Sequence, residues 1–211
     1  MHHFKTVPHV MIENGGSHKL AALLDQDALP HKVFVVTDNG LQKLGLLDPA
    51  LASLHEASIE TMVFDRVLAD PPQEIVLAGA EQARRFGADM ILGFGGGSPM
   101  DTAKVISALV GSKQPIETMY GVGLVKGPRL PLMLIPTTAG TGSEVTNVAI
   151  LTTGKTEKQG IVSDALYADR VLLDAGLTLG LPKSITVATG IDAMVHAIEA
   201  YTSLPQKNPL S

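Results

Sequence analysis

Short runs of apolar, often β-branched residues alternate with helix-forming segments along most of the chain. The clearest runs are predicted to be buried strands, at residues 32–37, 59–64, 90–94 and 130–135, with further candidates at 145–151 and 171–173. Apolar residues at helical spacing predict helices over residues 74–86, with Gly87 at the C′ position, and 101–110. Strands that are apolar on both faces and separated by helices favour a parallel sheet covered on both sides. The predicted fold is therefore α/β, with a mostly parallel sheet and helices on both faces.

The pattern changes near Leu181 and Pro182. From there to Tyr201 the sequence is rich in alanine, has helical spacing and gives no strand signal. We therefore predict a domain boundary at this point. Residues 1–181 would form the α/β domain, and residues 182–211 would begin an all-helical domain.

Composition narrows the classes of function. The net charge is −5, from 16 basic and 21 acidic residues, and no run of lysine or arginine occurs. Aromatic residues make up 4% of the chain, so a nucleic-acid partner is not expected. The absence of cysteine excludes disulfides, thiolate metal sites and a cysteine nucleophile. No apolar run approaches the ~18 residues of a membrane span, and the N-terminus lacks the apolar core of a signal peptide. We expect a cytoplasmic protein without a membrane partner.

A glycine-rich turn joins the strand at 90–94 to the helix that follows, with the sequence Gly95-Gly96-Gly97-Ser98-Pro99-Met100-Asp101. Adjacent glycines let the backbone turn tightly and approach a ligand closely. Ser98 is predicted as the N-cap, Pro99 as the first helical residue and Asp101 as the third. The free N–H groups of such a helix start form an anion site suited to a pyrophosphate. The turn matches neither the G-x-G-x-x-G fingerprint nor a Walker A loop, and a tight turn with an ordinary cap is the alternative.

Two other strand ends carry polar groups. Asp38 could accept hydrogen bonds from the adenine ribose and repel a 2′-phosphate, which favours NAD over NADP. The residues alone favour the simpler interpretation, an Asx turn at Asp38-Asn39-Gly40. Residues 136–144 are dense in hydroxyl groups and small side chains. They could bind phosphate or the nicotinamide end of a cofactor, or form an ordinary polar loop.

Asp192 and His196 are four residues apart in the last predicted helix and therefore share one face. A carboxylate and an imidazole on one face can bind a divalent metal. The alternative is a plain side-chain contact on a helix surface, and two ligands are fewer than a catalytic metal usually has. The other histidines all lie in the predicted sheet domain.

Three motifs in this order resemble the iron-containing alcohol dehydrogenase family. They are GGGSPMDTAK at residues 95–104, PTTAGTGSEVT at 136–146 and ATGIDAMVHAIEAY at 188–201. The resemblance implies a Rossmann-like dinucleotide-binding domain followed by an all-helical domain. It also implies hydride transfer between NAD and an alcohol or aldehyde, at a site holding Fe²⁺ or Zn²⁺.

The same resemblance assigns roles to individual residues. Asp38 would hold the adenine ribose, and Leu179 would pack near the adenine. The pyrophosphate would be bound by Gly95, Gly96, Gly97, Ser98, Pro99 and Asp101. Further contacts to the cofactor would come from Thr137, Thr138, Thr141 and Lys158. Asp192 and His196 would be the first two metal ligands. A homodimer would form through the N-terminal strands, around residues 4–12.

Two departures from the family pattern stand out. Asp70-Pro71 lies where the family often has Asn-Pro, which puts that cofactor contact in doubt. Family members are longer, and their two remaining metal ligands, both histidines, lie in a helical half that this sequence does not contain. We therefore expect a partial protein. The alternatives are a non-catalytic nucleotide-binding fragment, a lyase of the dehydroquinate synthase type and a metal-free maleylacetate reductase.

Overall fold

The computed structural model describes residues 5–24, 29–154 and 156–203. Its centre is a six-stranded sheet in the order β1-β9-β6-β4-β2-β3, in which every neighbouring pair is parallel. The strands are β1 (His9–Ile12), β2 (Lys32–Val36), β3 (Glu60–Phe64), β4 (Met90–Gly95), β6 (Leu132–Pro136) and β9 (Arg170–Leu173). The predicted parallel α/β fold is confirmed.

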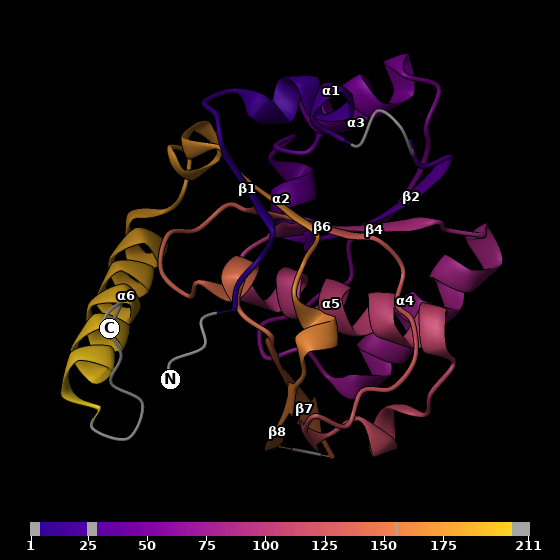
Figure 1. The fold of residues 1–211 in the computed structure, drawn as a ribbon. Helices are drawn as coiled ribbons and strands as arrows, with labels where there is room; N and C mark the ends of the chain where they lie inside the picture. Colours follow the sequence, from indigo (N-terminus) through magenta and orange to yellow (C-terminus); the bar gives the residue numbers. More distant parts are fainter. Residues whose placement is uncertain (1–4, 25–28, 155, 204–211) are drawn as a thin grey trace.

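Helices cover both faces of this sheet (Figure 1). On one face lie α1 (Leu20–Leu23), α2 (Asn39–Lys43) and α3 (Asp48–Glu56), and on the other lie α4 (Gln73–Phe86) and α5 (Gly97–Ser112). Short 3-10 helices occupy Gly16–Lys19, Ile116–Thr118, Ser143–Val145, Asp164–Leu166 and Ala175–Thr178.

The alternation of side chains in β2 builds a core on each face of the sheet. Val33 and Val35 belong to one buried cluster, which also contains Leu54 of α3. Phe34 and Val36 belong to the other, which also contains Val76 of α4. All four strand residues are at most 1% exposed. A strand buried on both faces must be apolar at every position, which explains the continuous apolar runs in the sequence.

A smaller sheet lies against α5, built from β5 (Gly121–Val122), β7 (Val148–Thr153) and β8 (Glu157–Val162). β7 and β8 form an antiparallel hairpin. The strand predicted at 145–151 begins three residues later, because residues 143–145 form a 3-10 turn. β8 was not predicted, since its first residues are polar and largely exposed and only its last two are apolar.

The start of α5 differs from the prediction. Ser98 is not the N-cap: the helix begins at Gly97, and Gly96 is the cap in an extended conformation (φ −78°, ψ −165°). Ser98 and Pro99 therefore lie inside the first turn, and Asp101 lies one turn in rather than at the third position. Pro99 is tolerated there because a residue in the first turn needs no intrahelical N–H bond. The predicted C′ role of Gly87 is confirmed by its left-handed φ of 77°.

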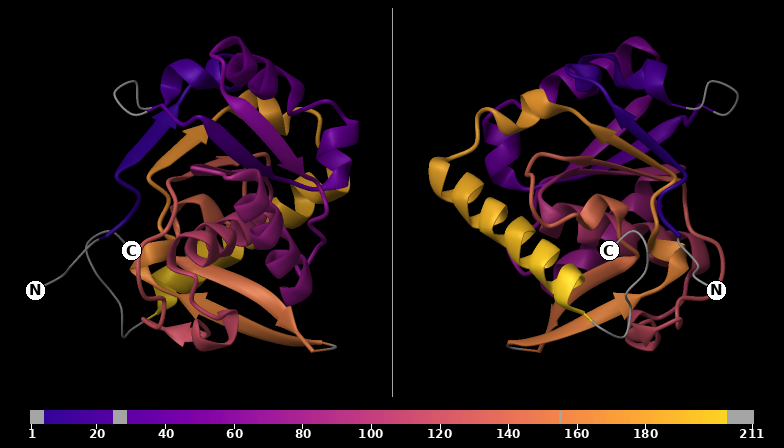
Figure 2. Two further views of the ribbon diagram at one scale, coloured as in Figure 1. Left: turned by 90° about the vertical axis from the view of Figure 1, so that its right-hand side faces the viewer. Right: turned by 60° about the vertical axis from the view of Figure 1, so that its left-hand side comes forward.

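The last helix, α6 (Lys183–Thr202), lies along the side of the α/β layers (Figures 1 and 2). Within the described chain, none of its residues is buried. Its exposed side chains include Ile191, Met194 and Ile198. No helix in the described ranges combines the length and apolarity needed to cross a bilayer.

Candidate functional site

Two cavities meet at the carboxyl ends of the central strands, where α5 begins. The first cavity has a volume of about 640 Å³ and is lined by residues of the β2–α2 and β3–α4 connections, by Thr137 and Thr138, and by Pro182 and Ile185 near the start of α6. The second cavity has a volume of about 540 Å³ and extends to the β7–β8 hairpin and to Asp192 and His196. Gly97 and Ser98 line both cavities, so the start of α5 stands between them.

Asp38 lies on the wall of the first cavity, directly after β2. Its carboxylate accepts a hydrogen bond from the Leu41 N–H at 3.0 Å and so caps α2. In place of the predicted Asx turn, Asn39 and Gly40 are the first residues of α2, and Asp38 is its N-cap. Leu44 and Leu68 line the same cavity and are more than half exposed. A helix-capping carboxylate beside exposed apolar side chains suits a ribose joined to a flat aromatic base.

The start of α5 has free donors and little side-chain bulk. The first helical bond runs from the Met100 N–H to Gly96, so helix geometry leaves the N–H groups of Gly97 and Ser98 without an intrahelical acceptor. Gly95 has a φ of 151°, which strongly favours glycine. A Cβ on Gly97 would stand 3.3 Å from Thr141, so a larger residue would fill the space between them. This arrangement suits a phosphate group.

The loop that follows β6, residues 137–146, is called the threonine loop below. Thr137 and Thr138 line the first cavity, and Thr141 lines the second. The Thr138 hydroxyl is buried and has no hydrogen-bond partner within the described part of the chain. Its side chain lies 3.5–3.6 Å from the Cβ position of Gly96. An unpartnered hydroxyl beside the helix start is the observation that best fits a dinucleotide in these cavities.

Asp70 and Lys158 form an ion pair of 2.6 Å on the wall of the second cavity. The pair joins the β3–α4 connection to β8, and Thr152 of β7 adds a hydrogen bond to the Asp70 carbonyl. Asp70 has a φ of 52°, in the left-handed region. Lys158, predicted to reach the cofactor, is therefore placed at the cavity with a carboxylate partner.

Asp101 lines the second cavity, but its carboxylate is already engaged. It accepts hydrogen bonds from the Ser143 hydroxyl at 2.5 Å, from the Ile150 N–H at 3.0 Å and from Lys104 at 3.4 Å. Sequence reasoning assigned Asp101 to the pyrophosphate and did not single out Lys104 or Ser143. Both are contained in the family motifs, but their contact spans 39 positions of sequence and has no local signature.

Asp192 and His196 share one face of α6, and both line the second cavity. The Asp192 carboxylate lies 3.8 Å from Nε2 of His196. Within the described ranges, no group of three or more His, Cys, Asp or Glu side chains is placed to hold a metal ion. The chain thus offers two donors, fewer than the three protein ligands usual for a catalytic metal.

Leu179 does not join the other predicted residues. It is 86% exposed and lines neither cavity. The apolar wall next to it in sequence is formed by Leu181, Pro182 and Ile185 instead. The chain turns between Leu179 and Leu181, which directs the earlier residue to solvent.

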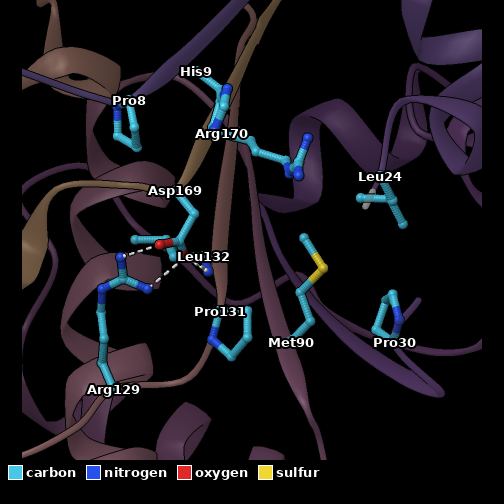
Figure 3. A pocket seen from close by; sticks show the side chains of 10 residues that line it. All are labelled: Pro8, His9, Leu24, Pro30, Met90, Arg129, Pro131, Leu132, Asp169 and Arg170. Atoms are coloured by element: carbon cyan, nitrogen blue, oxygen red, sulfur yellow. Dashed lines mark hydrogen bonds and ion pairs between the residues drawn. The ribbon is translucent and has the colours of Figure 1, made fainter. Parts of the chain in front are cut away.

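A further cavity, of about 470 Å³, lies at the amino ends of the central strands (Figure 3). Arg129 and Asp169 form a paired contact there, with nitrogen–oxygen distances of 2.6 and 2.7 Å. Asp169 also accepts a hydrogen bond from the Leu132 N–H. Burial raises the pKa of Asp169, but the bonds from Arg129 and Leu132 outweigh it, so the pKa lies below its ordinary value. The charges of Arg129 and Asp169 neutralise each other, and the bond from the Leu132 N–H to Asp169 links β6 to the start of β9.

Comparisons with known proteins agree on one family. The model of the iron-containing alcohol dehydrogenases matches residues 8–175. The sulfoacetaldehyde reductase of Bilophila wadsworthia (strain 3_1_6) is 43% identical over 190 residues, which cover 90% of this chain and 49% of that protein. A crystal structure of 1,3-propanediol oxidoreductase superposes with a TM-score of 0.93 at 34% identity, covering 100% of this chain and 55% of the other. A sulfoacetaldehyde reductase from Bifidobacterium kashiwanohense, solved in complex with NAD+, has a TM-score of 0.89 at 28% identity, with coverage of 99% and 55%.

The chain spans about half the length of the curated relatives it matches. The matched family model covers every strand of the six-stranded sheet, since β1 begins at His9 and β9 ends at Leu173. The sequence motifs and the fold agree with this match. The chain therefore belongs to the iron-containing alcohol dehydrogenase family.

Proposed function

We propose that the chain is the nucleotide-binding part of an oxidoreductase that transfers a hydride between NAD and a primary or secondary alcohol or the corresponding aldehyde. One observation carries the proposal: two cavities meet at the start of α5, beside the Thr138 hydroxyl, which has no hydrogen-bond partner among the residues that the structure describes. A dinucleotide has two lobes joined by a pyrophosphate, and the site has the same layout.

Each part of NAD has a proposed place. The adenosine half occupies the first cavity, where Asp38 accepts hydrogen bonds from the ribose and Leu44 and Leu68 contact the base. The pyrophosphate receives hydrogen bonds from the N–H groups of Gly97 and Ser98. The nicotinamide half occupies the second cavity, where Thr141 and Lys158 contact it. Gly95, Gly96 and Pro99 shape the turn, and Thr137 completes the wall.

NAD supplies the hydride chemistry when bound, and the chain supplies position and charge. The free N–H groups at the start of α5 offset the negative charge of the pyrophosphate. The carboxylate of Asp38 repels a 2′-phosphate, which favours NAD over NADP. The nicotinamide ring is directed toward the side of the second cavity where Asp192 and His196 lie.

Asp192 and His196 are the proposed first ligands of Fe²⁺ or Zn²⁺. The described residues do not complete a ligand set, so we derive no step through the metal for this chain. We propose that α6 begins a second, helical domain at residue 182 and that this domain supplies the remaining ligands. The exposed apolar side chains of α6 support this, because a helix normally buries its apolar face against another element.

Relatives differ in what their names say they act on, from sulfoacetaldehyde to long-chain alcohols and choline. The proposed substrate is therefore an alcohol or aldehyde without further definition. We also propose a homodimer through β1, which lies at the edge of the sheet with Val10 and Ile12 exposed. The two-donor metal face favours a second candidate for the chain by itself, a nucleotide-binding fragment without turnover.

Calorimetric titration of the chain with NAD and NADP, each with and without Fe²⁺ or Zn²⁺, tests the proposal. We expect NAD to bind more tightly than NADP and the metal to bind weakly, since the described residues bring only two donors together. A folded chain that binds neither nucleotide would refute the cofactor site. Tight metal binding would show that further ligands lie within the 211 residues.

A further inference from the structure

Lys104 is a fully buried cation in the middle of α5. Its ammonium nitrogen donates to the Ser143 hydroxyl at 2.9 Å, the Thr146 hydroxyl at 3.2 Å and the Val148 carbonyl at 2.8 Å. The Asp101 carboxylate lies 3.4 Å away. Three of these partners come from the threonine loop and the strand after it, so one side chain holds α5, the loop and β7 together.

All four partners of Lys104 line the second cavity, whereas Lys104 itself does not. The ammonium group therefore lies behind the cavity wall and fixes the residues that form it. Ser143 extends the connection, since its N–H donates to the Thr141 hydroxyl at 3.3 Å. Thr141 in turn lies over Gly97, at the start of α5. A continuous set of contacts thus runs from Lys104 to the helix start assigned to the pyrophosphate.

A buried lysine at this position is unfavourable for the stability of the fold. Burial lowers the pKa of Lys104 from its ordinary value, although Asp101 and Glu144 act in the opposite direction. An apolar side chain of similar length would fill the same volume without that desolvation cost. What only the ammonium group supplies is a set of donors that converge on the threonine loop. Such a buried network gives its partners a single geometry.

We propose that Lys104 is a positioning residue for the nicotinamide half of the cofactor, acting through Ser143 and Thr141. The inference rests on the proposed function. Loss of the ammonium group should disturb the first cavity less than the second, because the side chains proposed to hold the adenosine, Asp38, Leu44 and Leu68, belong to the β2–α2 and β3–α4 connections and not to the threonine loop. It would loosen the threonine loop on the side of the second cavity. Binding of a whole dinucleotide should suffer, and binding of a ligand confined to the first cavity should not.

The test compares NAD with AMP, which occupies only the adenosine side and the helix start. Calorimetry would be run on the wild-type chain and on Lys104→Met, Ser143→Ala and Thr102→Val. Thr102 is a matched control: it is on the same helix and equally buried, and its hydroxyl has no partner within the described residues. Circular dichroism and thermal unfolding would verify that each variant is folded.

We expect Lys104→Met to weaken NAD binding roughly tenfold, the usual scale for loss of a supporting group behind a ligand site. Ser143→Ala should weaken it about two- to tenfold, the equivalent of one net hydrogen bond. AMP binding should stay within about twofold of wild type in both, because it depends on the first cavity. Thr102→Val should leave both ligands unaffected.

The outcomes separate this inference from the proposed function. If the wild-type chain binds AMP and NAD equally or binds neither, the two-cavity cofactor site is wrong. If the wild-type chain binds NAD well and a folded Lys104→Met does so equally, the positioning role is refuted. An equal loss of AMP and NAD affinity would also refute it, since that result indicates a general structural role. If Lys104→Met does not fold, the NAD-to-AMP comparison in Ser143→Ala decides.

Discussion

Gly140 of the threonine loop and Thr189 of α6 meet at the level of their backbones. A Cβ on Gly140 would stand 2.8 Å from the carbonyl carbon of Thr189 and closer still to its carbonyl oxygen. Asp192 and His196 follow Thr189 on the same helix and reach the second cavity. Because glycine has no side chain, residue 140 allows the proposed metal-binding face of α6 to approach the proposed nicotinamide site closely.

Gly140→Ala should displace α6 without unfolding the sheet domain. The new methyl group meets backbone atoms, which cannot rotate away, so the contact costs about 1–3 kcal/mol, as overpacking typically does. We expect faster amide hydrogen exchange across residues 183–202 and little change in the central strands. Gly190→Ala is the control, because no described residue lies within 4 Å of its Cβ position and alanine in a helix interior should slow rather than speed exchange. Unchanged exchange in Gly140→Ala would mean that this contact does not hold α6.

Asp38→Ser should relax the preference for NAD while keeping the cap of α2. Serine can accept the Leu41 N–H as Asp38 does, but it carries no charge. Like charges about 4 Å apart repel by 1–4 kcal/mol, so the NADP-to-NAD affinity ratio should rise about tenfold or more. Asp38→Ala should shift the ratio equally and also lose about 0.5–2 kcal/mol of stability with the cap. Calorimetry and urea unfolding measure the two effects, and a constant ratio would remove Asp38 from the ribose site.

Asp70→Asn should tighten NAD binding. Asparagine tolerates the left-handed backbone as aspartate does, and the change frees Lys158 from its carboxylate partner. Both side chains are more than half exposed, and an exposed ion pair is worth up to about 1 kcal/mol, so the gain should be roughly two- to fivefold. The gain should vanish in the Asp70→Asn, Lys158→Met double variant. Weaker binding of Asp70→Asn would instead show that the carboxylate itself contacts the nucleotide.

Asp174→Asn should destabilise the chain at neutral pH. The Asp174 carboxylate accepts hydrogen bonds from the Gly15, Ser17 and Gly176 N–H groups and from the Ser17 hydroxyl. Burial raises its pKa, but these bonds outweigh burial and hold the pKa below the ordinary value of 3.8. Hydrogen bonds to a charged group are worth about 1.5–3 kcal/mol, which is the expected loss of unfolding free energy at pH 7.

The sign of the pH effect follows from the lowered pKa of Asp174. Its contribution is complete above the unfolded pKa and is lost as the pH falls through the folded pKa. The difference in urea-unfolding free energy between wild type and Asp174→Asn should therefore shrink below about pH 4. A difference independent of pH would assign the effect to shape rather than charge.

Local patterns in the sequence predicted five of the six strands of the central sheet, all but β1, and the turn at which the two cavities meet. Val33 and Phe34 are adjacent and both buried, on opposite faces, and only a strand covered on both sides explains such runs. Glycines between a strand and a helix indicated the helix start at which the two cavities meet. The boundary of α5 was missed because Gly96 accepts the cap conformation without a capping side chain.

The working contacts of the site depended on tertiary structure. Three contacts of the site join separate elements that lie far apart in the chain. They are Lys104 with Ser143, Asp70 with Lys158, and Gly140 with Thr189. Helix and strand periods determine which face of an element a residue occupies, but they carry no information about what packs opposite. The sequence alone predicted a mostly parallel α/β sheet with a glycine-rich turn between a strand and a helix. Only packing decided that Asp101 is held by Lys104 and that α6 meets the threonine loop, because those contacts exist only after the layers assemble.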